Sequence, residues 1–172
     1  MKRILKGLLM LIVLWASVVA AKEETIRELS WRPPTTEELG GAAAQKWRED
    51  DPAHYLAMTG DFDGDGKPDR ARLMVRADGK AYALFVKLAG RDTDLKLDEF
   101  PYMKTLPSTG LKRVAPDTYP TACARGIDCA EDEPRYIHVT RDAIDYFQHD
   151  SADRYYYWND TRHAFAQVGI TG

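Results

Sequence analysis

The chain has 172 residues, 44% of them hydrophobic and 30% charged, and its formal net charge is −3. This length suits one globular domain and leaves too little chain for two full hydrophobic cores. The 12 glycines and 9 prolines follow no period, which excludes a collagen-like fibre, and the 10% aromatic content excludes a chain that is disordered throughout.

The first 21 residues have the pattern of a secretory signal peptide. Lys2, Arg3 and Lys6 precede a short apolar run over residues 7–19, and two alanines follow it. A charged start, a short apolar stretch and small residues at a cleavage site are typical of an export signal. The run is shorter than the ~20 residues that a membrane-spanning helix needs. We therefore expect cleavage after Ala20 or Ala21 and a periplasmic or secreted protein without a membrane span.

Removal of this signal makes the protein more acidic. The three basic residues leave with it, so the formal net charge changes from −3 to about −6. An acidic exported protein without a basic patch is a poor candidate for binding nucleic acid. We expect no nucleic-acid partner, and instead a protein or glycan partner in the cell envelope.

Residues 22–34 are predicted to form an extended lead-in, because the two prolines at its end disfavour helix before them. Thr35 and Glu38 have the spacing of a capping box, which predicts a short helix from Thr35 to about Trp47. From residue 35 to residue 172 we expect a single β-rich domain.

The loop Gly-Asp-Phe-Asp-Gly-Asp-Gly-Lys-Pro-Asp, residues 60–69, carries the most specific chemical signal. Its four carboxylates repel one another at neutral pH unless a cation neutralises them. Gly66 permits the sharp turn by which such a loop coils around a centre, and hard oxygen ligands favour Ca²⁺ over zinc or copper. An acidic, solvated turn without a metal is the alternative. The predicted ligands are Asp61, Asp63, Asp65, Asp69 and the backbone carbonyl of Lys67.

This loop differs from an EF-hand, because its twelfth position is Arg72 instead of a bidentate glutamate and a strand pattern follows it. Residues 59–75, the loop with the alternating Arg-Ala-Arg-Leu-Met-Val after it, resemble the FG-GAP/VCBS class of calcium loops. The resemblance implies a structural Ca²⁺ at a turn leading into a β-strand, held by the ligands named above. A single copy does not make a propeller, which takes at least ~4 blades. Without the glutamate we expect a weak affinity, on the order of 10⁻⁴ to 10⁻³ M.

The rest of the chain shows the alternation of β-strands. Ala71, Leu73 and Val75 alternate with polar residues, and Asp78-Gly79 then separates this run from residues 81–88, which predicts a type I′ hairpin. Residues 91–134 are rich in turn formers, and we expect one or two short strands there, such as residues 112–114. Four further strands are predicted at residues 135–140, 144–148, 154–158 and 163–170.

The two cysteines, Cys123 and Cys129, stand six positions apart in this turn-rich segment. In an oxidising compartment, two cysteines and no third predict one intrachain disulfide. Closing a loop of seven residues stabilises the protein by at most about 2.4 kcal/mol. The predicted fold is therefore mainly β (α+β), with antiparallel hairpins or a meander, one short N-terminal helix, one disulfide and a calcium loop.

A second, softer resemblance covers the C-terminal half. Tyr119-Pro-Thr-Ala-Cys123, Glu133-Pro134 and Tyr156-Tyr157-Trp158 make it similar to small exported bacterial proteins of unknown function that pair such a loop with a Cys loop. This resemblance implies no activity.

The run Tyr155-Tyr-Tyr-Trp158 is the second feature with binding potential. On a strand, Tyr155 and Tyr157 share one face and Tyr156 and Trp158 the other. One face is expected in the core. The other forms either ordinary cross-strand packing or an exposed aromatic platform for a sugar ring or a partner protein.

The sequence contains no recognisable catalytic set, and we expect that the protein is not an enzyme. The predicted function is an exported, periplasmic calcium-binding structural or binding module. One alternative is an inhibitor or immunity-type protein that contacts its partner through Arg125 and Asp128 of the Cys loop. Another is a glycan-binding or glycan-cleaving protein that uses the aromatic strand.

Overall fold

The computed structural model of the chain describes residues 30–40, 46–48, 51, 53–127, 129, 133–149, 151 and 153–170. The expected signal peptide, most of the expected lead-in and Asp128 lie outside these residues. The described part is mainly β, as the sequence predicts, and every strand pair in it is antiparallel.

A five-stranded sheet is formed by the first half of the described chain. Its order is β1-β3-β4-β5, and β2 pairs with β3 beside β1. The strands are β1 (Trp31–Arg32), β2 (Ala57–Gly60), β3 (Asp69–Arg76), β4 (Tyr82–Lys87) and β5 (Leu95–Phe100).

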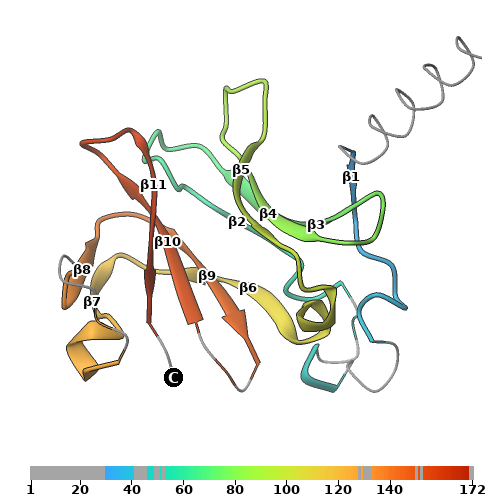
Figure 1. The fold of residues 1–172 in the computed structure, drawn as a ribbon. Coiled ribbons are helices and arrows are strands. Elements are labelled where there is room, and N and C mark those ends of the chain that lie inside the picture. Colours follow the sequence, from blue (N-terminus) through green and yellow to red (C-terminus); the bar gives the residue numbers. More distant parts are fainter. Residues whose placement is uncertain are drawn as a thin grey trace, which may run out of the picture.

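A four-stranded sheet with the order β11-β10-β9-β6 is formed mostly by the second half, and β7 and β8 make a separate pair. Figure 1 shows the two larger sheets facing each other, with the β7–β8 pair at one end of the four-stranded sheet. These strands are β6 (Thr109–Val114), β7 (Asp117–Pro120), β8 (Tyr136–Val139), β9 (Ala143–Gln148), β10 (Asp153–Asn159) and β11 (Ala164–Gly169). Short 3-10 turns are η1 (Lys46–Arg48), η2 (Met103–Ser108) and η3 (Cys123–Arg125).

The main hydrophobic core lies between the two larger sheets. It contains Leu73 and Leu84 from the five-stranded sheet and Ile144 and Tyr156 from the four-stranded sheet, all at most 2% exposed. The hydroxyl of Tyr82 on β4 lies 2.7 Å from that of Tyr146 on β9, so a buried hydrogen bond also joins the sheets. A smaller cluster covers the opposite face of the four-stranded sheet and packs beneath β7 and β8.

The predicted hairpin of residues 70–88 is confirmed as β3 and β4, with Ala71, Leu73 and Val75 buried. The predicted turn type, I′, is wrong. That turn needs a positive φ at both central residues, whereas Gly79 has φ 70° and Asp78 is not in the left-handed region. The loop is longer because the Asp78 carboxylate accepts the Lys80 amide at 2.9 Å and pairs with Arg76.

The predicted short N-terminal helix is not shown. Thr35 and Glu38 do form the reciprocal bonds of a capping box, at 2.9 and 3.3 Å. Residues 36–40 make only a turn, which ends at Gly40 with φ 83°, a conformation that terminates helices. Residues 41–45 lie outside the described part, and η1 follows them.

Between residues 91 and 134, the predicted strand at residues 112–114 is confirmed as part of β6. The expectation of at most two short strands is wrong, since β5, β7 and two 3-10 turns lie there as well. The strand β5 is interrupted by a bulge, at which the pairing shifts between Leu84 and Phe85 of β4. A bulge breaks the two-residue alternation by which a strand is recognised in a sequence.

Candidate metal centre

The acidic loop between β2 and β3 brings three of its carboxylates together. Ligand oxygens of Asp61, Asp63 and Asp65 lie within 4.8 Å of one another; Asp65 is exposed and the other two are half-buried. The chain coils because these side chains accept backbone amides. Asp61 Oδ1 accepts the Gly64 amide at 2.8 Å, and Asp61 Oδ2 accepts the Gly66 amide at 3.0 Å.

Gly66 lies at a turn of this coil. Its φ is 81°, in the left-handed region that favours glycine, and an added Cβ would meet nothing within 4 Å. The backbone conformation therefore accounts for glycine at this position, as expected from the sequence.

Lys67 contributes its amide and its ammonium to the same loop. The amide donates to Asp65 Oδ1 at 2.8 Å, and the ammonium lies 3.2 Å from Asp65 Oδ2. The hydrogen bond from the Lys67 amide is the largest cause that holds the pKa of the Asp65 carboxyl below its usual value. A bound cation would compete with this ammonium for Asp65.

Asp69, the fourth predicted acidic ligand, is not part of the cluster of three. It is 1% exposed, and its two oxygens accept the backbone amides of Phe62 at 2.8 Å and Ala89 at 2.7 Å. Burial raises the pKa of its carboxyl. The carboxylate of Asp69 thus fixes the entry into β3, whether or not it also binds an ion.

The loop docks on the four-stranded sheet through residues that the sequence analysis did not identify. The amide of Asp61 donates to Asp142 Oδ2 at 3.1 Å, and the Arg141 guanidinium donates to the carbonyl of Asp63. Arg141 also pairs with Asp160 in the turn after β10, at 2.8 Å. Some 80 residues separate Arg141 and Asp142 from the loop in the chain, so no local pattern indicates these contacts.

This arrangement suits a small hard cation better than other chemistry. Three converging carboxylates provide the oxygen ligands that Ca²⁺ prefers, and among the described loop residues there is no imidazole or thiolate. In the described part of the chain, Lys67 and Arg141 bring positive charge to the loop through direct contacts, fewer than its four carboxylates. The residues present therefore fit the group that the calcium-loop resemblance implies.

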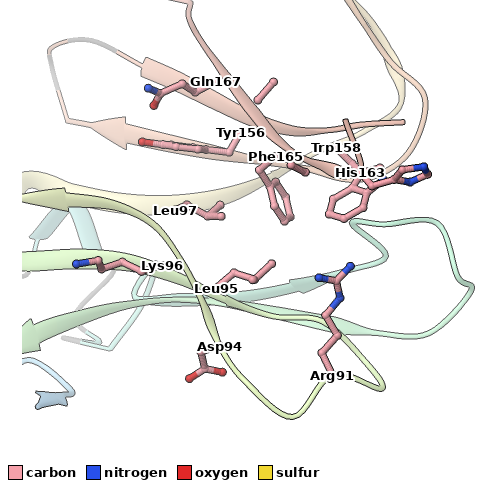
Figure 2. Close-up of a pocket in the computed structure, with 12 residues that line it drawn as sticks. Arg91, Asp94, Leu95, Lys96, Leu97, Tyr156, Trp158, His163, Phe165 and Gln167 are labelled. Atoms are coloured by element: carbon pink, nitrogen blue, oxygen red, sulfur yellow. The ribbon is translucent and has the colours of Figure 1, made fainter. Parts of the chain in front are cut away.

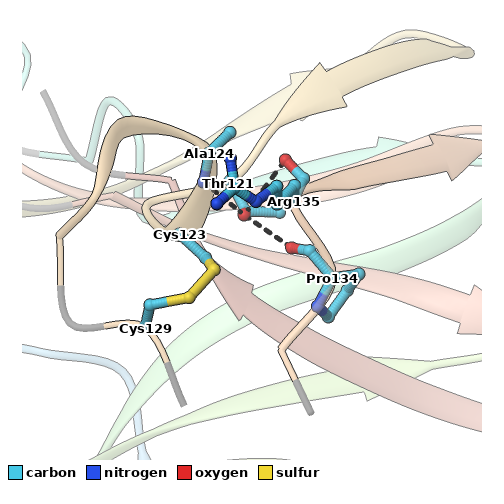
Figure 3. The surroundings of a disulfide bond; sticks show 6 residues. All are labelled: Thr121, Cys123, Ala124, Cys129, Pro134 and Arg135. Carbon is cyan, nitrogen blue, oxygen red and sulfur yellow. Dashed lines mark hydrogen bonds between the residues drawn. A yellow bond between two sulfur atoms is a disulfide. The ribbon is translucent and has the colours of Figure 1, made fainter. Parts of the chain in front are cut away.

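The predicted disulfide between Cys123 and Cys129 is present (Figure 3). The segment before it is anchored by Thr121, which is buried and whose hydroxyl donates to the carbonyl of Pro134 at 2.6 Å. The amide of Ala122 donates to the carbonyl of Gly169 at 2.8 Å, which joins this loop to the end of β11. Arg125 is exposed at its tip.

The aromatic strand is β10, and both of its faces are packed. Tyr156 is 2% exposed in the main core, while Tyr155 and Tyr157 are half-buried against the smaller cluster. The ring of Tyr155 packs edge-on against Tyr119 at 5.3 Å. Tyr155 and Tyr157 therefore take part in cross-strand packing and do not form an exposed platform.

Among the described residues, no helix is long and apolar enough to cross a membrane. Comparisons of the chain with models of known families, with curated proteins and with solved structures found no match.

Proposed function

We propose that the protein is an exported module that binds a partner in the cell envelope, without catalysis, and that one Ca²⁺ in the loop of residues 61–69 stabilises it. The convergence of the Asp61, Asp63 and Asp65 carboxylates within 4.8 Å supports the calcium part of this proposal. Like charges held this close destabilise the folded loop unless a cation is bound between them.

The position of the loop explains why an ion would stabilise the whole fold. The loop leads into β3 of the five-stranded sheet and contacts Arg141 and Asp142 next to β9 of the four-stranded sheet. A cation that fixes the loop would therefore also hold one sheet against the other. The export pattern and the disulfide suit a compartment in which calcium is plentiful and thiols oxidise.

Thermal unfolding with and without Ca²⁺ tests the proposal. We expect millimolar Ca²⁺ to raise the melting temperature of the mature protein measured against EDTA, and Mg²⁺ to raise it less. Asp63→Asn keeps an oxygen for the Asp65 amide but removes one charge. In EDTA it should therefore melt at or above the wild-type temperature, because less repulsion remains, and it should lose the calcium increment.

Asp92→Asn is the matched control, since Asp92 is an exposed aspartate in the loop between β4 and β5. This variant should keep the full increment. A wild-type melting temperature that does not change with millimolar Ca²⁺, or an increment that Asp63→Asn retains, would contradict the proposed site.

A further inference from the structure

A cleft of about 480 Å³ lies between the two larger sheets (Figure 2). Its volume is within the range of ligand sites, roughly 300–1,000 Å³. Residues 94–97 of one sheet and 164–167 of the other line it as two consecutive runs. Since alternate residues of a strand point to opposite faces, two consecutive runs mean that the cleft follows the edges of β5 and β11.

Both strands are edge strands, and the hydrogen bonds of β11 show which of its backbone groups face outward. The carbonyl of Gly169 accepts from Ala122 outside the sheet, and the amide of Ile170 donates to Asp153 of β10. Antiparallel pairing alternates residue by residue. The amides and carbonyls of Phe165 and Gln167 therefore face away from β10, and within the described chain no backbone hydrogen bond to another segment is made by them.

The edge of β11 lacks the features by which proteins protect an edge from pairing. Its sequence, Ala-Phe-Ala-Gln-Val-Gly, contains no charge and no proline, and its pairing with β10 has no bulge. The facing strand β5 has both a bulge and the charged residues Lys96, Asp98 and Glu99. Of the two edges in the cleft, β11 is the one open to another strand.

The lining of the cleft is mixed, and part of it is apolar. Leu95, Leu97, Trp158 and Phe165 line it, and each is a partly buried side chain that packs against the main core. The core thus reaches solvent here, and an apolar side chain that entered the cleft would bury this surface.

One end of the cleft is positively charged. The Arg91 guanidinium points across it toward Trp158 and His163 (Figure 2), and its carbon lies 5.8 Å from the centre of the Trp158 ring. Asp94 is paired with Arg72, and no ion pair of Arg91 is found in the described part of the chain. In an acidic protein, this cation beside apolar side chains favours a carboxylate.

We propose that the cleft binds an extended peptide of a partner protein, which adds a strand to the edge of β11 and places an apolar and an acidic side chain in the cleft. Backbone bonds to Phe165 and Gln167 would give affinity, while the apolar part of the lining and Arg91 would select the side chains. This inference rests on the binding role proposed above, whose partner it specifies, and not on the calcium site.

A second copy of the chain fits the cleft less well than a single peptide. Its β11 is joined to β10 along one edge and faces its own β5 across its own cleft. To pair with β11, the second copy would have to bring its whole sheet edge into the space between β11 and β5. A single peptide strand is smaller and needs less room.

Selection from a displayed library of random heptapeptides on the purified mature protein provides the probe. We expect enriched peptides that combine an apolar residue with Asp or Glu within two positions. Binding of a synthetic enriched peptide should slow hydrogen exchange at the amides of Phe165 and Gln167. Exchange at Ala166 and Val168, which already bond to β10, should hardly change.

Variants separate the backbone from the side-chain contribution. Arg91→Gln should weaken the peptide about tenfold or more, as expected for a charge-assisted bond, and Arg135→Gln, an exposed control outside the cleft, should not. Gln167→Pro removes one outward amide and leaves the bonds to β10 intact, so it should abolish binding while Gln167→Ala retains it.

Peptides methylated at alternate backbone nitrogens should bind in one methylation register and fail in the other, which tests strand addition without any protein variant.

Absence of enrichment for acidic, apolar peptides would overturn the inference, as would equal affinity for wild type and Arg91→Gln. Equal binding of both methylated registers, or a dimer formed through β11 that excludes the peptide, would do the same. All affinities are measured in Ca²⁺ and in EDTA. If the peptide binds but the melting temperature does not depend on calcium, only the calcium proposal is contradicted. If the melting temperature depends on calcium but no peptide binds, only the peptide proposal is contradicted.

Discussion

Asp63 and Asp69 belong to the same acidic loop, yet their carboxylates lie in different surroundings. Asp63 is half-buried beside Asp61 and Asp65, whereas Asp69 is buried and bonded to two backbone amides. We therefore expect the first carboxylate to gain from a cation, whereas the second stabilises the fold directly. The sequence groups all four aspartates by spacing, because spacing does not reveal which side chain turns toward the backbone.

Asp69→Ala should lower the free energy of unfolding by about 2–6 kcal/mol, since two backbone amides lose their acceptor at about 1–3 kcal/mol each. The loss should be nearly equal in Ca²⁺ and in EDTA, as measured by urea denaturation. Asp63→Asn provides the comparison, because it should be less stable than the wild type only in Ca²⁺. A variant at Asp69 as stable as the wild type in EDTA would contradict the structural role.

Asp145 on β9 is a carboxyl held in an unfavourable place. Its Oδ1 is buried, with no hydrogen-bond partner among the described residues. Burial, the largest cause, and the charge of Asp153 together raise the pKa of Asp145 to about 7, although Lys112 opposes the change. The folded protein therefore binds this proton more tightly than the unfolded chain does.

Because of this proton, the free energy of unfolding should depend on pH. Between the unfolded pKa, about 4, and the folded pKa, about 7, the folded state holds more protons, so the contribution of Asp145 to the free energy of unfolding falls as the pH rises. Asp145→Asn should therefore stabilise the protein at pH 8 by on the order of 2 kcal/mol and change little at pH 4. Urea denaturation at both pH values checks this, and a gain that is equal at both would refute it.

At the scale of elements, alternation predicts the strands whose two faces differ. In β3 the buried Ala71, Leu73 and Val75 alternate with accessible side chains, and the predicted strand is found. In β5 the bulge hides the pattern, and both this strand and its edge position were missed. The capping residues Thr35 and Glu38 predict a helix that Gly40 ends within one turn. Local signals therefore identify where an element starts more reliably than how far it extends.

The Cys loop is an element whose stability contribution can be measured separately. The disulfide joins Cys123 to Cys129, and the amide of Ala122, next to Cys123, donates to the carbonyl of Gly169 at the end of β11. Replacing Cys123 and Cys129 by alanine should lower the free energy of unfolding by about 2 kcal/mol, in line with closure of a seven-residue loop. Reduction of the wild type should reproduce the loss in urea denaturation. A double variant as stable as the oxidised wild type would show that the loop is held by its backbone bonds alone.

At the scale of the molecule, two sheets are joined by a buried core, by the hydroxyl pair of Tyr82 and Tyr146, and by the acidic loop. The composition of the loop predicts a cation site, but its contact with Arg141 and Asp142 depends on a chain reversal some 80 residues later. Contacts of this kind follow from topology, which single-sequence patterns do not specify. The same holds for the cleft between β5 and β11.

The most direct test of the calcium account is a titration of the mature, isotope-labelled protein with Ca²⁺, followed through its backbone amide resonances. We predict saturable shifts of the amides of Gly64, Gly66 and Lys67, with a midpoint on the order of 10⁻⁴ to 10⁻³ M. Smaller shifts should reach Asp142 across the sheet junction, and Asp63→Asn should remove them all. Amides that stay in place, shifts that rise linearly without saturation, or the same shifts in Asp63→Asn would contradict a cation bound by the three carboxylates.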